Sequence, residues 1–228
     1  MTRDRFFRAA GKGEPELSGA DGRTLDFYRR QAGPVTARYE AAVRDDEMDR
    51  VVLAFLQGAG KGLAQGGVAL LDVGLGSGRD LARWIRAGFD GYGVDASREM
   101  VEAARALHPE LAGRVRVDSL PGLGGIPSNV FDAVTCQAVL MHLGQEEIRA
   151  SGAGFRRVLR DGGRLVVSIP LRGPDVDGQN RSVQDGRLYT PVDAGELSEM
   201  LAGEGFALAG RVDSADTMGR SGRSWTTL

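Results

Sequence analysis

The chain has 228 residues, a length that suits one domain, or one domain with a small cap. Its net charge of −2 gives no general attraction to nucleic acid or anionic membranes, and no apolar run is long enough to span a membrane. The first residues lack a signal-peptide core, and a single cysteine, Cys136, excludes internal disulfides and a cysteine-based zinc site. We therefore expect a cytoplasmic protein without a metal site.

The N-terminal part of the chain reads as an arm followed by helices. Residues 1–22 are polar and glycine-rich, which predicts a loose arm, or one that orders late. Pro34 interrupts the mixed stretch over 24–44, so two short helices are expected there. A third helix, capped by Asp45 or Asp46, has one apolar face formed by Met48, Val51, Val52, Phe55 and Leu56. A glycine-rich linker over 58–67 follows.

From residue 68 onward, apolar runs alternate with helical patterns. Strands are predicted over 68–73, 91–95, 114–117, 130–137 and 165–169. Helices are predicted over 79–87, 97–107 and 145–159, and a further one begins at the capping box of Asp193 and Glu196. Residues 171–188 are polar and irregular, while 206–212 and 224–228 can close the sheet. The alternation predicts an α/β fold with a mainly parallel sheet and helices on both faces.

The rest of the chain is organised around a glycine turn that follows the first of these strands. Gly74, Gly76 and Gly78 have the spacing G-x-G-x-G, which differs from the dinucleotide fingerprint G-x-G-x-x-G. Glycines allow positive φ and close approach of a ligand, and the helix that follows presents free N–H groups. Such a turn can cradle a nucleotide-like or carboxylate-bearing ligand.

Acidic and polar residues end the next strands at the edge of the sheet where ligands bind. Asp95 ends the second strand, where a carboxylate can accept both hydroxyls of a ribose. Asp118 ends the third, where it, or the N–H groups around Ser119 and Leu120, can meet an adenine edge. Gln137 is in the group of residues that ends the fourth strand.

These pieces resemble the class I S-adenosylmethionine-dependent methyltransferases, in the group of small bacterial enzymes. The matching segments span about 68–169 in the order and spacing typical of that family: Leu71–Gly78, Gly93–Ser97 with Met100, Phe131–Val134, Leu140–Leu143 and Leu159–Leu165. Leu75 departs from the pattern, because the family more often has a small residue at that position. A larger side chain there could tighten the cofactor pocket.

The resemblance implies a Rossmann-like seven-stranded sheet whose last strand is antiparallel, with an N-terminal helical lid. Residues 1–66 would form the arm and lid, and residues 67–228 the core that binds S-adenosylmethionine. The three glycines would approach the methionine part of the cofactor and Asp95 would hold the ribose. Further cofactor contacts are expected from Arg79, Ala96, Met100, Asp118, Ser119, Leu120 and Gln137. For Arg79, a role in beginning the helix is an equal alternative.

The acceptor side of the expected site is less well defined by the sequence. Tyr28, Tyr39 and Arg44 are candidates to touch the cofactor carboxylate or the substrate, and Tyr189 is a candidate to touch the substrate. The reaction is a direct displacement at the methyl carbon, which requires alignment and exclusion of water. A base is needed only for a protonated nucleophile, and His142 is the candidate, with packing or holding of a backbone group as the alternative role.

We therefore predict transfer of a methyl group to a small-molecule acceptor, with neither nucleic acid nor membrane as partner. No basic stripe and no Asn-Pro-Pro-Tyr type signature is present, although a protein side chain stays possible as acceptor. Two other classes are a protein that binds S-adenosylmethionine without methylating, since fold does not fix function, and a nicotinamide-dependent oxidoreductase. The glycine spacing argues against the oxidoreductase.

Overall fold

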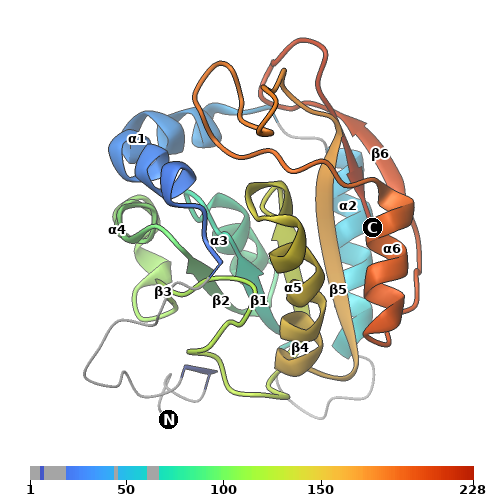
Figure 1. The fold of residues 1–228 in the computed structure, drawn as a ribbon. Helices are drawn as coiled ribbons and strands as arrows, with labels where there is room; N and C mark the ends of the chain where they lie inside the picture. The colour runs from blue at the N-terminus through green and yellow to red at the C-terminus, as the bar shows by residue number, and fades with distance from the viewer. Residues whose placement is uncertain (1–5, 8–18, 44–45, 61–66) are drawn as a thin grey trace.

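The computed structural model describes residues 6–7, 19–43, 46–60 and 67–228 (Figure 1). Seven strands form one sheet in the order β3-β2-β1-β4-β5-β7-β6. The strands are β1 (Ala69–Val73), β2 (Asp90–Asp95), β3 (Val115–Val117), β4 (Phe131–Gln137), β5 (Leu159–Arg172), β6 (Val212–Ala215) and β7 (Ser224–Thr227). The first five are parallel, and β7 runs antiparallel to both β5 and β6. The predicted seven-stranded sheet with an antiparallel last strand is confirmed.

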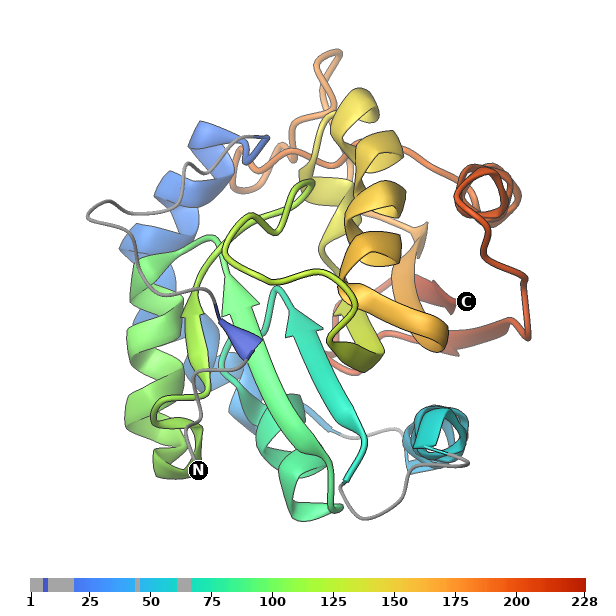
Figure 2. The ribbon, with the colours of Figure 1, turned by 90° about the horizontal axis from the view of Figure 1, so that it is seen from below.

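Helices cover both faces of this sheet (Figure 2). They are α1 (Gly22–Ala41), α2 (Asp46–Gln57), α3 (Arg79–Arg86), α4 (Arg98–Leu107), α5 (Gln145–Val158) and α6 (Ala194–Gly203). Alternate residues of a strand point to opposite faces. Leu71 of β1 accordingly packs in one core cluster with Phe155 of α5, and Leu70 in a second with Trp84 of α3. All five residues of β1 are buried, as expected for a central parallel strand.

The N-terminal helix differs from the prediction of two short helices. Residues 22–41 form one helix of 20 residues with Pro34 inside it. Proline removes only one backbone donor from the helix. Just before Pro34, the carbonyl oxygens of Ala32 and Gly33 accept hydrogen bonds from the Thr36 hydroxyl at 2.8 Å and 3.0 Å. The helix packs against α4 and buries Val35 and Thr36. Tertiary packing therefore outweighs the local preference of proline to end a helix.

Two further predictions from apolar runs are corrected. Residues 206–211 do not form a strand, because α6 ends in a turn through Gly205 and β6 begins only at Val212, which pairs with Thr227 of β7. The fifth strand is longer than the predicted 165–169. It starts at Leu159, which pairs with Phe131, and its register shifts before Arg164 pairs with Ala133. Pairing with the neighbouring strands sets both boundaries.

The N-terminal arm is not loose throughout, because Phe6 is part of the core. Its side chain is 1% exposed, and its ring lies 4.3 Å from the Tyr92 ring and 5.1 Å from the Phe131 ring. Tyr92 and Phe131 belong to β2 and β4, on either side of β1. An apolar side chain of the arm therefore anchors it on the sheet.

Candidate active site

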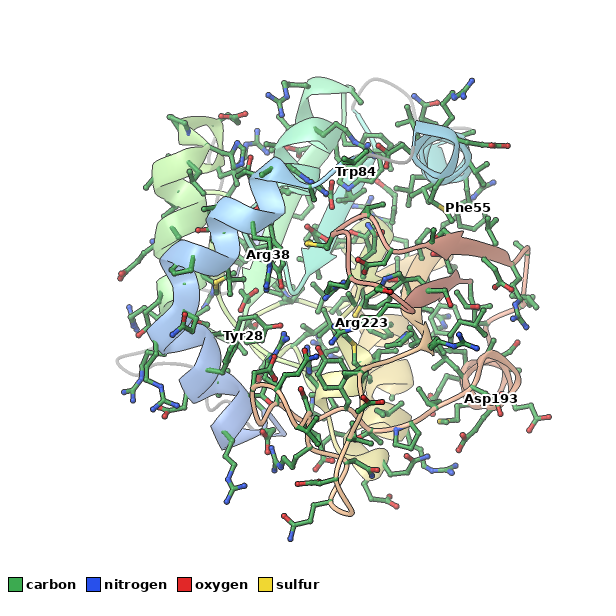
Figure 3. The ribbon with its side chains drawn as sticks, turned by 90° about the horizontal axis from the view of Figure 1, so that it is seen from above. Tyr28, Arg38, Phe55, Trp84, Asp193 and Arg223 are labelled. Atoms are coloured by element: carbon green, nitrogen blue, oxygen red, sulfur yellow. The ribbon has the colours of Figure 1, made fainter. Side chains whose placement is uncertain are left out.

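A cavity of about 320 Å³ lies where the carboxyl ends of the central strands meet α1. Its wall is drawn from the glycine turn, the ends of β2 and β4, the inner side of α1, the segment around Arg187 and the loop between β6 and β7. Figure 3 looks down on this end of the molecule, with α1, which carries Tyr28, on one side and the loop that carries Arg223 on the other. Open parallel sheets bind ligands at this edge, and the volume is in the range of small-molecule sites.

The glycine turn between β1 and α3 requires glycine for two different reasons. Gly74, Gly76 and Gly78 all have positive φ, of 74°, 58° and 81°. Gly74 and Gly76 line the cavity, whereas Gly78 is absent from its wall. A Cβ at Gly78 would lie 2.5 Å from Cδ1 of Leu111, so this glycine lets the turn pack against the segment after α4. The geometry thus gives Gly78 a packing role.

Asp95 lies at the end of β2, beside the glycine turn. Its Oδ2 accepts a hydrogen bond from the Gly76 N–H at 3.1 Å, and its Oδ1 accepts one from the Ser97 N–H at 2.9 Å. Burial raises the pKa of Asp95 to about 6, although these backbone donors oppose the shift. Carboxylate oxygens can accept further hydrogen bonds, so Asp95 can hold the turn and still bind hydroxyl groups.

The other expected cofactor residues around the strand ends all line the same cavity. They are Ala96, Met100, Asp118, Ser119, Leu120 and Gln137. Asp118 accepts hydrogen bonds from the N–H groups of Ser119 (2.9 Å) and Gly125 (2.8 Å), and burial raises its pKa. These bonds order the loop after β3, so its backbone is held at the cavity wall.

Arg79 also lines the cavity, but its guanidinium is bound to the C-terminal end of α1. Its Nη1 donates to the carbonyl oxygens of Tyr39 (2.6 Å) and Ala42 (3.3 Å). Next to it, the Ser77 hydroxyl donates to the Glu40 carboxylate at 2.6 Å, and His108 lies 3.3 Å from the same oxygen. We call the contacts of Arg79, Ser77 and His108 with residues 39–42 the latch. They hold α1 against the glycine turn.

The expected substrate residues come together on the side of the cavity formed by α1. Tyr28, Tyr39 and Tyr189 all line it, although Tyr189 is 161 positions after Tyr28 in the chain. Arg44 lies outside the described residues. The Tyr39 ring also approaches the glycine turn, because a Cβ on Gly76 would lie 3.3 Å from Cε2 of the ring. Aromatic side chains therefore form much of this wall.

His142 is buried in the cavity wall with both ring nitrogens engaged. Its Nδ1 lies 2.7 Å from the Leu188 carbonyl oxygen and therefore donates, which leaves Nε2 to accept from the Tyr28 hydroxyl at 3.2 Å. Burial, together with the nearby Arg187, lowers the pKa of His142 to about 4. The imidazole is neutral at pH 7, and it fixes both Tyr28 and the backbone of the 188 segment.

Arg187 is a functional candidate that the sequence analysis did not single out. Its side chain is 6% exposed, it lines the cavity, and it donates to the Tyr28 hydroxyl (2.8 Å) and to the Asp185 carboxylate (2.8 Å). Although burial opposes its charge, Tyr28 and Asp185 raise the pKa of Arg187, so it is a cation. A single arginine in a polar, irregular segment gives no local signal of this placement.

The loop between β6 and β7 adds a last part of the wall. Arg220 lines the cavity with Met218 and Trp225. Arg220 is ion-paired with Asp216, which also accepts from Trp225 Nε1 at 3.0 Å. Burial alone would raise the pKa of Asp216, but its hydrogen bonds from Arg220 and Trp225 lower it to about 2. The ion pair within the loop therefore helps to hold it in this conformation at the cavity wall.

Two further features concern ligands and membranes. Among the residues that the structure describes, no group of three or more His, Cys, Asp or Glu side chains is placed to hold a metal ion. No helix in the described part of the chain is both long and apolar enough to cross a membrane.

Comparisons with known proteins bear on the family of the chain. A family model described as a methyltransferase domain matches residues 71–167. The ubiquinone biosynthesis O-methyltransferase of Xanthomonas oryzae pv. oryzae is 35% identical over 112 residues, covering 47% of this chain and 45% of that protein. An uncharacterized 37.1 kDa protein in transposon TN4556 of Streptomyces fradiae is 31% identical over 158 residues, covering 64% of this chain and 45% of that protein. The chain thus spans about half the length of the curated relatives it matches.

The fold is similar to that of solved structures over most of the chain. The magnesium protoporphyrin IX methyltransferase of Synechocystis PCC 6803, with bound S-adenosylhomocysteine, superposes with a TM-score of 0.64 at 23% identity. That similarity covers 91% of this chain and 98% of the other. Sequence and fold agree, and the domain match covers the glycine turn, Asp95 and His142. Residues 71–167 of this chain therefore match a methyltransferase domain, within a fold like that of a solved methyltransferase with bound S-adenosylhomocysteine.

Proposed function

We propose that this protein binds S-adenosylmethionine and transfers its methyl group to a small-molecule acceptor. The observation that carries the proposal is that the residues expected to bind the cofactor and those expected to bind the acceptor line the same cavity. Gly74, Gly76 and Asp95 line it from the ends of β1 and β2, and Tyr28 and Arg187 line it from α1 and from the segment that follows β5. A cofactor and an acceptor bound to these two sets of residues would meet inside a space that α1 covers.

The residues present fit the adenosine and methionine parts of the cofactor. Gly74 and Gly76 line the cavity, and a ligand can approach the backbone of a glycine turn closely. Asp95 would accept the ribose hydroxyls, and Asp118 with Ser119 and Leu120 would lie along the adenine. When bound, S-adenosylmethionine supplies an activated methyl group, so the protein need only align it with the nucleophile.

For the chain itself we propose a lid and a core. Residues 1–66 would contribute the arm and the lid, of which α1 covers the cavity, and residues 67–228 would form the core that carries the glycine turn. The latch would keep α1 closed during transfer and so exclude water from the site. Tyr39, Tyr189 and Arg44 would then contribute to acceptor binding.

We propose His142 as a positioning residue for Tyr28 rather than as a strong base. Its Nε2 is already engaged by the Tyr28 hydroxyl, and a pKa of about 4 makes it a poor proton acceptor at neutral pH. An acceptor that reaches the site already ionised, or as a neutral amine, needs no stronger base. The proposal that His142 removes a proton requires the Tyr28 contact to open first.

The experiment that tests the proposed function is calorimetric titration with S-adenosylhomocysteine, with NADH as a parallel control. We expect binding of S-adenosylhomocysteine in the micromolar range or tighter, and none of NADH. Transfer of a labelled methyl group to members of an acceptor panel would then demonstrate the activity. Binding of NADH alone would contradict the proposal, and cofactor binding without transfer to any class of acceptor would favour a protein that binds without methylating.

A further inference from the structure

Arg187 is a buried cation whose guanidinium donors do not all have hydrogen-bond partners among the described residues. A guanidinium has five N–H donors. Nη1 donates to the Tyr28 hydroxyl and Nη2 to Asp185, both at 2.8 Å, while the buried Nε has no hydrogen-bond partner among the described residues. Buried donors of folded proteins almost always have partners. An unpartnered donor of a buried cation, in the wall of a cavity, therefore points to a ligand.

A neighbouring arginine in the same segment shows the contrast. Arg181 binds both oxygens of Asp21 through Nη1 (2.7 Å) and Nη2 (2.8 Å), and it does not line the cavity. Its bidentate ion pair is a complete structural contact that joins the segment to the start of α1. The guanidinium of Arg187 instead donates to one oxygen of Asp185, whose other oxygen accepts from the Arg187 backbone N–H, and Arg187 lines the cavity. Arg181 therefore has a structural role, whereas Arg187 is available to contact a ligand in the cavity.

The surroundings of Arg187 indicate what kind of group it would bind. Its guanidinium carbon lies 4.5 Å from the centroid of Phe27, 5.4 Å from that of Tyr28 and 5.5 Å from that of Tyr189. These rings exclude water from the cation, which strengthens its hydrogen bonds to an anion. His142 beside it is neutral, so it adds no competing charge.

The chemistry of the free donors favours a carboxylate. The planar fork of a guanidinium matches the two oxygens of a carboxylate, and Tyr28 and Tyr189 in the cavity wall suit a flat apolar body attached to it. We infer that Arg187 binds the carboxylate of the methyl acceptor, and that the acceptor is a small planar carboxylic acid. This inference rests on the proposed function, because it assigns the acceptor side of the same cavity.

The experiment compares matched probes on the protein saturated with S-adenosylhomocysteine. We would titrate the complex with 4-hydroxybenzoate and with its neutral counterpart 4-hydroxybenzamide, using calorimetry. The carboxylate should bind at least about tenfold more tightly than the amide, because it gains a charge-assisted contact. In Arg187→Gln this preference should vanish, while affinity for S-adenosylhomocysteine stays the same. Arg181→Gln, which removes a partly buried guanidinium from the same segment, should keep the preference.

Several results would overturn the inference. Equal binding of the two probes, or no binding of the carboxylate, would mean that water or the protein alone satisfies Arg187. Weaker binding of S-adenosylhomocysteine to a folded Arg187→Gln protein would assign the arginine to the carboxylate of the cofactor. If Arg187→Gln does not fold, the wild-type comparison of the two probes still decides. Failure of the wild type to bind S-adenosylhomocysteine at all would instead contradict the proposed function.

Discussion

At the scale of single residues, the packing of Leu75 explains how the glycine turn accommodates a large side chain. The sequence suggested that a large residue there could tighten the cofactor pocket. In the structure Leu75 packs in the core cluster with Leu81 and Trp84, and its Cδ2 would lie 3.0 Å from a Cβ on Gly93. The missing side chain of Gly93 on β2 makes room for Leu75. The turn therefore tolerates leucine because the neighbouring strand carries glycine.

Leu75 also lines the cavity, but its packing in the core predicts that it matters more for stability than for cofactor affinity. Leu75→Ala should lower the free energy of unfolding by about 2–4 kcal/mol, as for other buried leucines. Affinity for S-adenosylhomocysteine should change by less than about threefold, below 1 kcal/mol. Denaturant unfolding and calorimetry would measure the two effects. Much tighter cofactor binding with unchanged stability would show that Leu75 obstructs the pocket.

Asp95 gives a second prediction at this scale. Asp95→Ala should weaken binding of S-adenosylhomocysteine by more than about tenfold, through loss of a charge-assisted contact to the ribose. In the wild type the affinity should also fall as the pH drops below about 6, because the carboxylate becomes protonated there.

The control for this pH dependence is Asp95→Asn, which keeps the shape of the side chain without the titration. Its affinity should be weaker but nearly independent of pH between about 5 and 8, when measured by the same calorimetric titration. An unchanged affinity in folded Asp95→Ala would mean that the ribose is held by other residues.

At the scale of elements, the latch couples α1 to the glycine turn. The contacts join residues that are 37 to 68 positions apart in the chain, and they include both the backbone and a side chain of α1. Arg79 donates to two carbonyl groups at the end of the helix, those of Tyr39 and Ala42, and the Tyr39 carbonyl also accepts from the Ala42 N–H. The position of α1 and the geometry of the glycine turn are therefore coupled.

We predict that Arg79→Gln loosens α1. Hydrogen exchange of amides in residues 22–41 should become faster, and S-adenosylhomocysteine should dissociate several-fold faster, because local opening costs less. Arg29→Gln is the matched control, since Arg29 lies on the exposed side of α1 and pairs only with Asp26 among the ion pairs described for it. A loss of affinity without faster exchange would instead assign Arg79 directly to the cofactor.

At the scale of the whole molecule, buried acids at the centre of the sheet make stability depend on pH. Asp72 of β1 is 5% exposed and accepts a hydrogen bond from the Thr135 hydroxyl at 2.7 Å. Burial raises the pKa of Asp72 to about 7, and that of Asp95 to about 6. Between the unfolded value near 4 and these values, the folded state binds more protons than the unfolded state. The contribution of these acids to stability therefore falls as the pH rises.

Asp72→Asn tests this linkage. The variant lacks the buried charge, so relative to wild type it should gain stability from pH 5 to pH 8, by on the order of 1–3 kcal/mol. Chemical unfolding at several pH values would measure the difference. Asp213→Asn, at an exposed position on β6, serves as the comparison, because its pKa is lowered and its contribution is complete at neutral pH. A constant difference between Asp72→Asn and wild type would show that Asp72 does not titrate in this range.

The sequence by itself determined the alternation of strands and helices, the glycine turn and the acids that follow the strands. These features are local, because hydrophobic period, turn chemistry and capping act over a few residues. Asp193, for example, accepts from the Glu196 N–H at 2.9 Å, as its capping box predicts. The positions of Asp95 and Asp118 at the cavity also follow from the rule that ligands bind at the carboxyl ends of parallel strands.

Only the tertiary structure decided the features that depend on contacts between distant segments. Helix α1 continues through Pro34 because it packs on α4, and Phe6 is buried because β2 and β4 leave a place for it. Arg187 reaches Tyr28 across 159 positions of sequence. No local pattern contains such information, since the energy of a buried contact depends on partners that the chain brings together only when folded.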